Sequence, residues 1–116
     1  MLIEDIQKIC KKFPYVTEDI KWGAHLAFCI GEKMFMITSP DSSPISATFK
    51  VDEEDFALLL EKDGFSPATY VGRYKWITID NINRLSKKQW EEYLKKAYSL
   101  IKDKLPQKKK RELGIG

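Results

Sequence analysis

Histidine and cysteine are scarce in this 116-residue chain: His25 is the single histidine, and Cys10 and Cys29 are the two cysteines. Structural zinc sites draw their ligands from Cys and His, and a Ser-His-Asp triad depends on its histidine, so every such site would have to be built around His25. The cysteines form no CxxC pair, and the chain has neither a GxGxxG nor a GxxxxGKS/T motif. We therefore expect a non-enzymatic protein with no metal and no cofactor.

Long apolar runs and targeting signals are also absent. No apolar run approaches the roughly 20 residues that span a bilayer, and the N-terminus lacks the basic and apolar regions of a secretory signal. Cys10 falls in a helical pattern and Cys29 in an apolar run, which favours two buried free thiols in a reducing compartment over a disulfide. These features predict a cytoplasmic protein without a membrane partner.

The composition is that of one soluble globular domain, with 43% hydrophobic and 32% charged residues. The formal net charge of +3 is unevenly distributed. Residues 102–112 contain six cations and two anions, which gives this segment +4 and leaves −1 for the rest of the chain. We predict a single domain over residues 1–106 and a basic C-terminal tail over residues 107–116. The run Lys108–Arg111 in this tail is either a nucleic-acid contact or a solvated, frayed terminus.

Three stretches have helical periodicity. Apolar residues recur every three to four positions from Ile3 to Phe13, which predicts a helix of about 12 residues that Pro14 ends. Asp52 is a suitable N-cap for a second helix, and Gly64 is available to end it in the left-handed conformation. Ser86-Lys87-Lys88-Gln89 supplies a capping box for the last helix, which runs until Pro106. The buried stripe of this helix is expected to consist of Trp90, Leu94, Ala97 and Ile101.

Four other segments have the character of strands. The apolar runs 26–30 and 34–38 are joined through Gly31-Glu32 and predict a β-hairpin. A third strand is expected over 45–51 and a fourth over 76–79. The third strand alternates, with one face formed by Ala47, Phe49 and Val51 and the other by Ser46, Thr48 and Lys50. The order α-β-β-β-α-β-α predicts an α+β fold, an antiparallel sheet covered by helices on one face.

Two Lys-Trp pairs, Lys21-Trp22 and Lys75-Trp76, stand on separate segments of the chain. Trp combines a large apolar surface with one hydrogen-bond donor, and a Lys stem can lie along apolar surface while its ammonium stays in water. The pairs are therefore either two core anchors with lysine stems covering them or parts of one aromatic and basic surface. The sequence leaves both interpretations open.

Several short motifs together resemble the YjbR/MmcQ family over nearly the whole chain. They are Phe13-Pro14, Thr17-Glu18-Asp19-Ile20-Lys21-Trp22-Gly23, Lys33-Met34-Phe35, Phe49-Lys50-Val51, Tyr70, Lys75-Trp76, and Leu105-Pro106 with the basic stretch that follows. The resemblance implies a small cytoplasmic α+β domain whose fold is compared with CyaY, a frataxin-like protein, and with type III secretion chaperones. It also implies a double-wing DNA-binding role.

Basic residues interleaved with aromatic ones suit phosphates and nucleic-acid bases, which supports the same role. We predict a weak, sequence-independent nucleic-acid-binding surface formed by Lys21, Trp22, His25, Lys50, Arg73, Tyr74, Lys75 and Trp76. The alternative is a chaperone-like adaptor whose open sheet face or strand edge binds a peptide, a protein partner or a second copy, as a monomer or weak homodimer. Because solvated cations add little stability, replacing Lys50 and Lys75 with Ala is expected to leave the melting temperature nearly unchanged.

Overall fold

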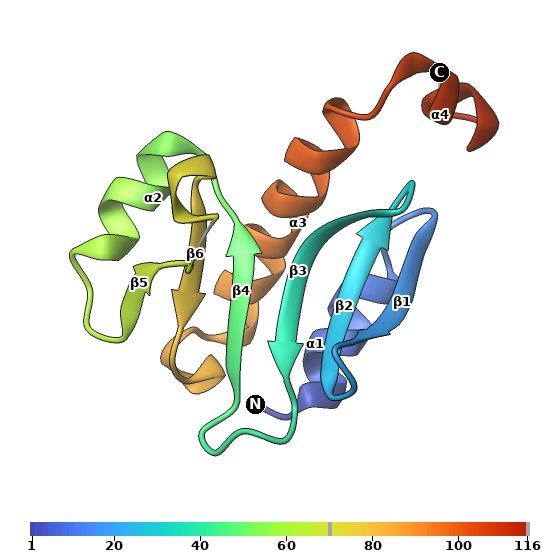
Figure 1. Ribbon diagram of the computed structural model, residues 1–116. Coiled ribbons are helices and arrows are strands. Elements are labelled where there is room, and N and C mark those ends of the chain that lie inside the picture. Colours follow the sequence, from blue (N-terminus) through green and yellow to red (C-terminus); the bar gives the residue numbers. More distant parts are fainter. Residues whose placement is uncertain (70, 116) are drawn as a thin grey trace.

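The computed structural model describes residues 1–69 and 71–115. Over these residues the chain forms one antiparallel sheet of six strands, four α-helices and two short 3-10 helices (Figure 1). The elements in chain order are α1 (Ile3–Lys11), β1 (Val16–Lys21), β2 (His25–Ile30), β3 (Lys33–Ser39), β4 (Ser46–Lys50), α2 (Glu53–Leu60), β5 (Phe65–Pro67), η1 (Gly72–Tyr74), β6 (Trp76–Ile79), η2 (Ile82–Arg84), α3 (Lys87–Asp103) and α4 (Gln107–Glu112).

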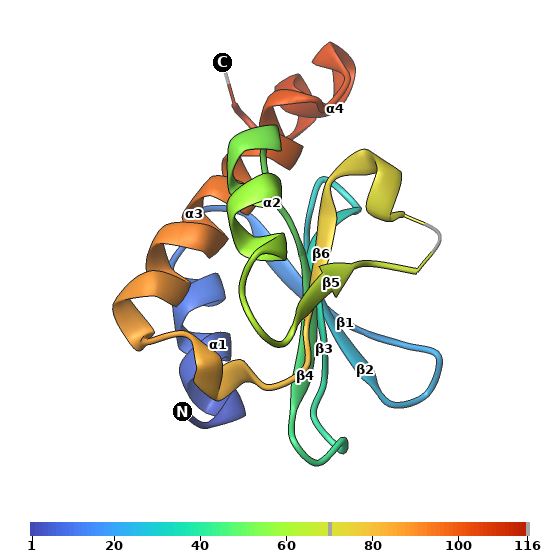
Figure 2. The same cartoon turned by 90° about the vertical axis from the view of Figure 1, so that its left-hand side faces the viewer.

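The sheet has the strand order β1-β2-β3-β4-β6-β5, and every neighbouring pair is antiparallel. Helices α1, α2 and α3 lie on one side of it, which leaves the opposite side without a helical layer (Figure 2). We call these the helical face and the open face. The predicted α+β class and the helices on one side of the sheet are confirmed.

Alternation along the strands separates the two faces as the sequence predicts. Phe49 and Val51 belong to the hydrophobic core beneath the helices. Thr48, which lies between Ala47 and Phe49 on β4, pairs with Thr78 of β6 on the open face, where their hydroxyl oxygens are 2.8 Å apart. The core is therefore one layer between the sheet and the helices.

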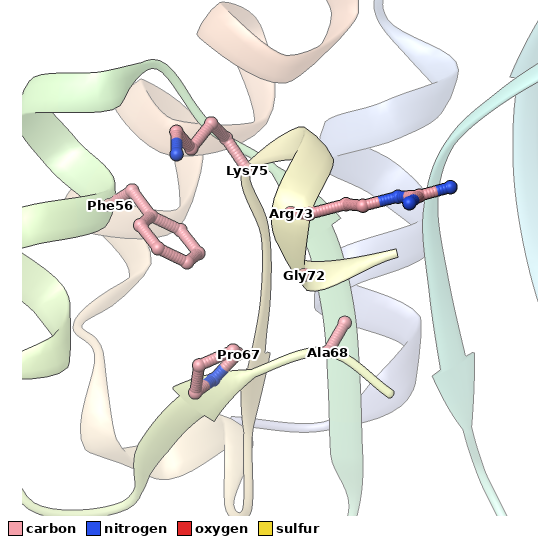
Figure 3. Close-up of a pocket in the computed structure, with 6 residues that line it drawn as sticks. All are labelled: Phe56, Pro67, Ala68, Gly72, Arg73 and Lys75. Carbon is pink, nitrogen blue, oxygen red and sulfur yellow. The ribbon is translucent and has the colours of Figure 1, made fainter. Parts of the chain in front are cut away.

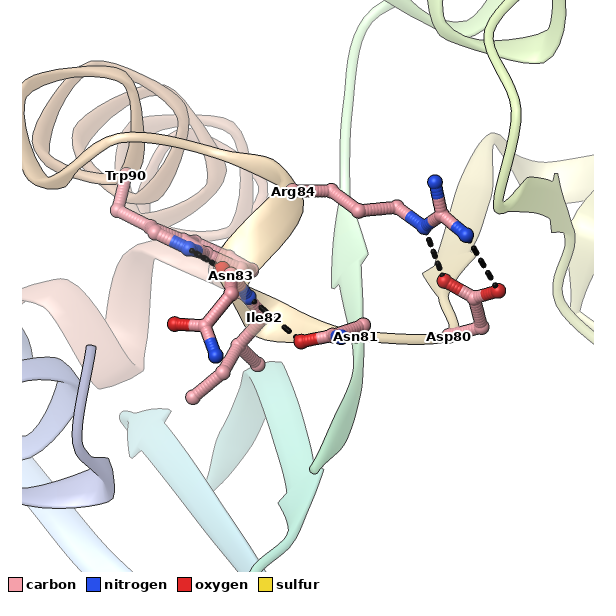
Figure 4. Close-up of polar contacts among 6 residues, drawn as sticks. All are labelled: Asp80, Asn81, Ile82, Asn83, Arg84 and Trp90. Atoms are coloured by element: carbon pink, nitrogen blue, oxygen red, sulfur yellow. Dashed lines mark hydrogen bonds and ion pairs between the residues drawn. The ribbon is translucent and has the colours of Figure 1, made fainter. Parts of the chain in front are cut away.

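Helix α3 forms the centre of that layer. Trp90, Leu94 and Ala97 are fully buried, as their helical spacing predicts, whereas Ile101, which was expected on the same stripe, is only half-buried. The Trp90 ring packs against Phe49 with 5.2 Å between ring centroids, and its Nε1 donates a hydrogen bond of 2.8 Å to the Ile82 carbonyl (Figure 4). Trp90 therefore ties the helix both to the sheet and to the η2 turn.

The expected N-caps are present, but Gly64 does not end α2, which ends at Leu60 with Glu61 as its C-cap. The Ser86 hydroxyl accepts from the Gln89 amide at 3.2 Å, and the Ser86 amide donates to Gln89 Oε1 at 2.9 Å, which completes the capping box. The Asp52 carboxylate accepts from the Asp55 amide at 2.7 Å and caps α2. The ends agree less well: α1 ends at Lys11, three residues before Pro14, and α3 ends at Asp103.

The hairpin between β2 and β3 is also confirmed. Gly31 and Glu32 both have positive φ, 57° and 67°. A two-residue turn with both central residues in this region matches the twist of the strands that it joins. The turn thus sets the pairing of β2 with β3, with a register shift between Phe28 and Cys29.

Both cysteines are buried free thiols, as predicted. Burial raises the pKa of the Cys10 thiol and of the Cys29 thiol, so both remain protonated at neutral pH. A protonated, buried thiol is a poor nucleophile and a poor metal ligand. Both cysteines therefore serve as packing residues.

Two strands were not predicted, and both lie at edges of the sheet. β1 carries Glu18, Asp19 and Lys21, and charged side chains are usual on an edge strand because they discourage pairing with another chain. β5 has only three residues and ends in Pro67, whose missing N–H is tolerated at an edge. Tertiary pairing rather than local pattern creates both strands.

The C-terminal segment after Pro106 is not a frayed tail in the residues described. It forms the short helix α4, and Leu113 and Ile115 pack against the core. Lys109 lies 3.7 Å from the Glu32 carboxylate at the β2–β3 turn. The docked apolar residues hold this basic segment on the domain.

None of the helices in the described residues has both the length and the apolar character that a membrane span requires. The expectation of an intracellular location remains a prediction from the sequence.

Candidate nucleic-acid interface

The open face is bounded by two projecting segments, which we call the first wing (residues 20–25) and the second wing (residues 68–75, of which Tyr70 lies outside the described residues). Figure 2 shows that the β1–β2 turn and the β5–β6 connection both project from the side of the sheet opposite the helices. Across the strands between them, one row on this face runs through Ala27, Ile37, Thr48 and Thr78. The open face is therefore a shallow surface between two raised rims.

The first wing carries Trp22 at its tip. The Trp22 side chain is 79% exposed, and its backbone has a φ of 51°, in the left-handed region. The indole meets the His25 ring edge-on, with 5.8 Å between centroids, and His25 Nδ1 lies 2.8 Å from Ser39 Oγ. Lys21 Nζ lies 3.5 Å from the Asp19 carboxylate. His25 and Ser39 both belong to the open face, so the indole also lies on that side.

The second wing contains η1 and presents an aromatic ring with a cation over it. Tyr74 is 54% exposed, and the Arg73 guanidinium carbon lies 4.8 Å from the centroid of its ring. Lys75 has a φ of 65°, and its Nζ lies 5.1 Å from the centroid of the Phe56 ring. Figure 3 shows Arg73 and Lys75 extending from η1 in different directions, with Phe56 and Pro67 lining a hollow of about 370 Å³ below Lys75.

A second hollow of about 560 Å³ lies where η1, the end of β4 and the end of α3 meet. We call it the basic notch and define it by its four cations, Lys50, Arg73, Lys75 and Lys104. Lys50 is only 8% exposed and donates a hydrogen bond to the Tyr74 carbonyl. An ammonium has three donors. In the described residues no second acceptor is bonded to the Lys50 ammonium.

Electrostatics in the notch favour an anion. Burial lowers the pKa of Lys50, and the positive charges of Lys104 and Lys75 lower it further. Asp52 acts in the opposite direction but more weakly than either lysine. Its carboxylate is also engaged in capping α2. The potential around Lys50 is therefore net positive, and a bound anion would relieve it.

The eight predicted site residues fall into two groups. Lys21, Trp22 and His25 belong to the first wing, and the notch is lined by the other five, Lys50, Arg73, Tyr74, Lys75 and Trp76. The first wing lies on the open face at one end of the sheet, whereas the notch lies at the other end, where α3 also lines it. Leu26, near the start of β2, pairs with Thr38 of β3, and Thr38 pairs with Ala47 near the start of β4. Lys50 lies at the opposite end of β4. The residues do not converge at one point.

The two Lys-Trp pairs have different environments. Trp76 is 9% exposed and anchors the start of β6, whereas Trp22 is largely exposed. The interpretation as a buried anchor therefore applies to Lys75-Trp76, and the interpretation as part of a surface applies to Lys21-Trp22. Trp76 is a core anchor, and Trp22 belongs to the surface.

Lys104 is the notch residue that sequence reasoning missed. It was counted only as part of the basic segment 102–112, because nothing in the linear sequence relates it to Lys50. Helix α3 runs behind β4 and places its C-terminal end at the notch (Figure 1). The tertiary path of the helix, rather than any motif, brings these two lysines together.

The burial of Lys50 corrects the expectation that Lys50→Ala is silent. We expect Lys50→Ala to lower the free energy of unfolding by about 1 kcal/mol, because it removes a hydrogen bond and the packing of a buried stem. Lys50→Met keeps the stem and removes the buried charge, so it should cost less, and Lys104→Ala should be neutral or stabilising because it removes repulsion. Urea denaturation of the three variants tests this, and an unchanged midpoint for Lys50→Ala would contradict it.

Among the described residues, no group of three or more His, Cys, Asp or Glu side chains is arranged to hold a metal ion. His25 has its Nδ1 beside a serine hydroxyl, with no carboxylate bonded to its ring among those residues. Cations and aromatic rings predominate in the candidate site, with the carboxylates of Asp52 and Glu53 beside them at the notch.

The fold is that of a small α+β protein built on a six-stranded antiparallel sheet. The model of the YjbR family matches residues 11–100, so the chain belongs to the YjbR family. This confirms the resemblance seen in the sequence motifs.

Comparison with solved structures supports the fold. The chain is similar to the crystal structure of the Deinococcus radiodurans protein DR2400, which has a DUF419 domain, with a TM-score of 0.85 and 21% sequence identity. The similarity covers 99% of this chain and 89% of that one. At this identity the likeness concerns the fold alone. A comparison with curated proteins found no match.

Proposed function

We propose that this protein binds DNA weakly and without sequence preference, with the basic notch as its main phosphate site. The observation that carries the proposal is the convergence of Lys50, Arg73, Lys75 and Lys104 on one hollow, where none of the four is ion-paired with a described residue. Phosphate contacts by cations supply most of the affinity of nonspecific DNA binding. A site of this kind needs no base-reading helix.

The grouping of four cations without ion-pair partners in one hollow supports the choice of the notch. Lys11, Lys96 and Arg84 each form an ion pair within the domain. The four notch cations, like most lysines and arginines of the chain, form no ion pair with any described residue, but these four line one hollow. Outside residues 102–112 the chain has a net charge of −1, so the attraction for DNA is local. The notch is where an external anion finds unpaired positive charge.

The protein's role is binding rather than catalysis in this proposal. The notch offers four cations together with the carboxylates of Asp52 and Glu53, and among the described residues its lining contains no serine, threonine, cysteine or histidine. His25 belongs to the first wing, at the other end of the open face. The cations are therefore assigned to positioning a phosphate backbone.

A salt series tests the proposal. Each phosphate contact contributes roughly −0.9 to the slope of log affinity against log salt on duplex DNA, so a site of three or four cations should give a slope of about −3. The double variant Lys75→Ala/Lys104→Ala should reduce this slope by about two. Binding of a labelled random duplex, followed by fluorescence anisotropy across salt concentrations, measures both values.

Two matched controls remove the same charge elsewhere. Lys87→Ala/Lys95→Ala lies on the exposed side of α3 and should leave the slope unchanged. Lys108→Ala/Arg111→Ala tests the basic α4 segment. If only the α4 variant weakens binding, the affinity comes from the C-terminal segment and the notch is not the site. If the intact protein binds no DNA at low salt, the proposal is wrong.

A protein partner is the second candidate function, favoured by the exposed apolar residues of the first wing and of the edge strand β1. Ile20, on β1, is 69% exposed. An unpaired strand edge beside apolar side chains can accept an extended peptide or a second copy of the domain. Such binding would depend little on salt, which separates it from the DNA proposal.

A further inference from the structure

The first wing exposes an aromatic side chain that the core does not need. Among the described residues, Trp22 is the most exposed of the large hydrophobic side chains. Its φ of 51° lies in a region that L side chains rarely adopt, where glycine would be free of strain. A strained, exposed Trp gains little from folding. Its place at the wing tip therefore suggests a contact with a ligand.

The surroundings of Trp22 hold the indole in place. The ring stands edge-on to His25, and His25 is in turn hydrogen-bonded to Ser39 on the neighbouring strand β3. The indole is thus supported by one T-shaped contact, while the 79% exposure of Trp22 leaves most of its surface accessible. This is the geometry of a platform rather than of a side chain that moves freely in solvent.

The second wing has a comparable arrangement. Tyr74 is exposed beside the Arg73 guanidinium, as Trp22 is exposed beside Lys21 in sequence. Both wings project on the same side of the sheet (Figure 2). The open face thus has an aromatic ring and a cation at each rim, with Ala27, Ile37, Thr48 and Thr78 between them.

We propose that Trp22 stacks on an unpaired base and that the protein consequently prefers single-stranded to double-stranded DNA. The inference rests on the proposed function, since the basic notch holds the backbone of the same strand. In a duplex the bases are stacked on one another, whereas a single strand offers their flat surfaces to aromatic side chains. Stacking of this kind tolerates any base, which agrees with binding without sequence preference.

The alternative occupant of the wing tip is an apolar protein surface. The charges favour DNA, because Lys21 adjoins Trp22, and the other rim carries Arg73. Asp19 partly offsets Lys21 at a distance of 3.5 Å. The salt dependence of binding separates the two occupants.

The test compares a 12-nucleotide single strand with a 12-base-pair duplex at one low salt concentration, using the full chain. The wild-type protein should bind the single strand more tightly. Trp22→Gly should lower the ratio of single-strand to duplex affinity about tenfold, and Trp22→Phe should lose much less because it keeps a ring. Glycine suits the backbone at this position, so the melting temperature of Trp22→Gly should not fall.

Intrinsic fluorescence supplies an independent measurement. Trp76 and Trp90 are buried, so quenching of Trp emission by the single strand should come from Trp22 and disappear in Trp22→Phe. If single strand and duplex bind equally and Trp22→Gly changes neither, the stacking inference is wrong while the notch proposal stands. If Lys75→Ala/Lys104→Ala leaves both affinities unchanged but Trp22→Gly abolishes them, the notch proposal fails instead. Salt-independent binding of a protein partner at Trp22 would overturn the stacking inference.

Discussion

Replacing Trp90 with Ala is expected to lower the free energy of unfolding by about 3–5 kcal/mol. Trp90 is fully buried, and its removal leaves a cavity between α3 and the sheet beside Phe49. It also leaves the buried Ile82 carbonyl without the hydrogen bond from the indole (Figure 4). Leu94→Ala, one turn along the same stripe, should cost about 2–5 kcal/mol for the cavity alone.

The matched controls are Lys87→Ala and Lys95→Ala, which lie on the exposed side of the same helix. Both substitutions keep helix propensity high and remove no core contact, so they should change stability little. Urea denaturation gives the free energy for all four variants. Similar losses for the buried and the exposed pair would show that α3 does not pack against the sheet as described.

Gly64→Ala is expected to cost about 1–2 kcal/mol from the backbone alone, because Gly64 has a φ of 87° in the left-handed region. A Cβ atom at this position would overlap the guanidinium of Arg84. That guanidinium pairs with Asp80 through contacts of 2.5 and 3.2 Å, shown in Figure 4. The Asp80 amide also donates to the Gly64 carbonyl at 3.0 Å. Backbone strain at Gly64 would therefore fall beside a hydrogen bond that joins the start of β5 to the end of β6.

A double-mutant cycle separates the two contributions. Arg84→Ala alone should hardly change the melting temperature, because the Asp80–Arg84 pair is solvent-exposed and such pairs add little. In the Arg84→Ala background, Gly64→Ala should cost less than in the wild type, since only the backbone strain remains. Thermal unfolding followed by circular dichroism measures the cycle, and a Gly64→Ala variant as stable as the wild type would refute the argument.

These stability predictions concern the helical face, whereas the proposed binding site lies at the rims of the open face. Trp22 is exposed at a wing tip, and the notch cations Arg73, Lys75 and Lys104 are not part of the hydrophobic core. Lys50 is the residue that belongs to both, since it is buried and faces the notch. Its substitution is therefore expected to change binding and stability together, so Lys75 and Lys104 are better probes of binding.

Elements with a strong local signal were predicted correctly from the sequence. The stripe from Trp90 to Ala97 has helical spacing, the Ser86–Gln89 capping box fixes where α3 begins, and Gly31 marks the β2–β3 turn. In each case the physical cause is local: periodicity of side chains, a cap for orphan amides, or a positive φ. The α+β class followed from the order of these elements.

Elements whose stability depends on a partner were not predicted correctly. β1 and β5 exist as strands because they pair with β2 and β6, and α4 is held by the packing of Leu113 and Ile115. Their own residues are charged, few or basic, so local pattern gave no signal. The end of α1 at Lys11 likewise differs from the proline-based prediction.

The sequence by itself determined the class of fold, the buried stripe of α3, the buried thiols and the residue types of the candidate site. The tertiary structure decided which of those residues meet. It buried Trp76 and Lys50, left Trp22 exposed at a wing tip, and brought Lys104 to Lys50 through the path of α3. The physical reason is that periodicity and capping act over a few residues, whereas a binding surface depends on strand register and helix packing between distant parts of the chain.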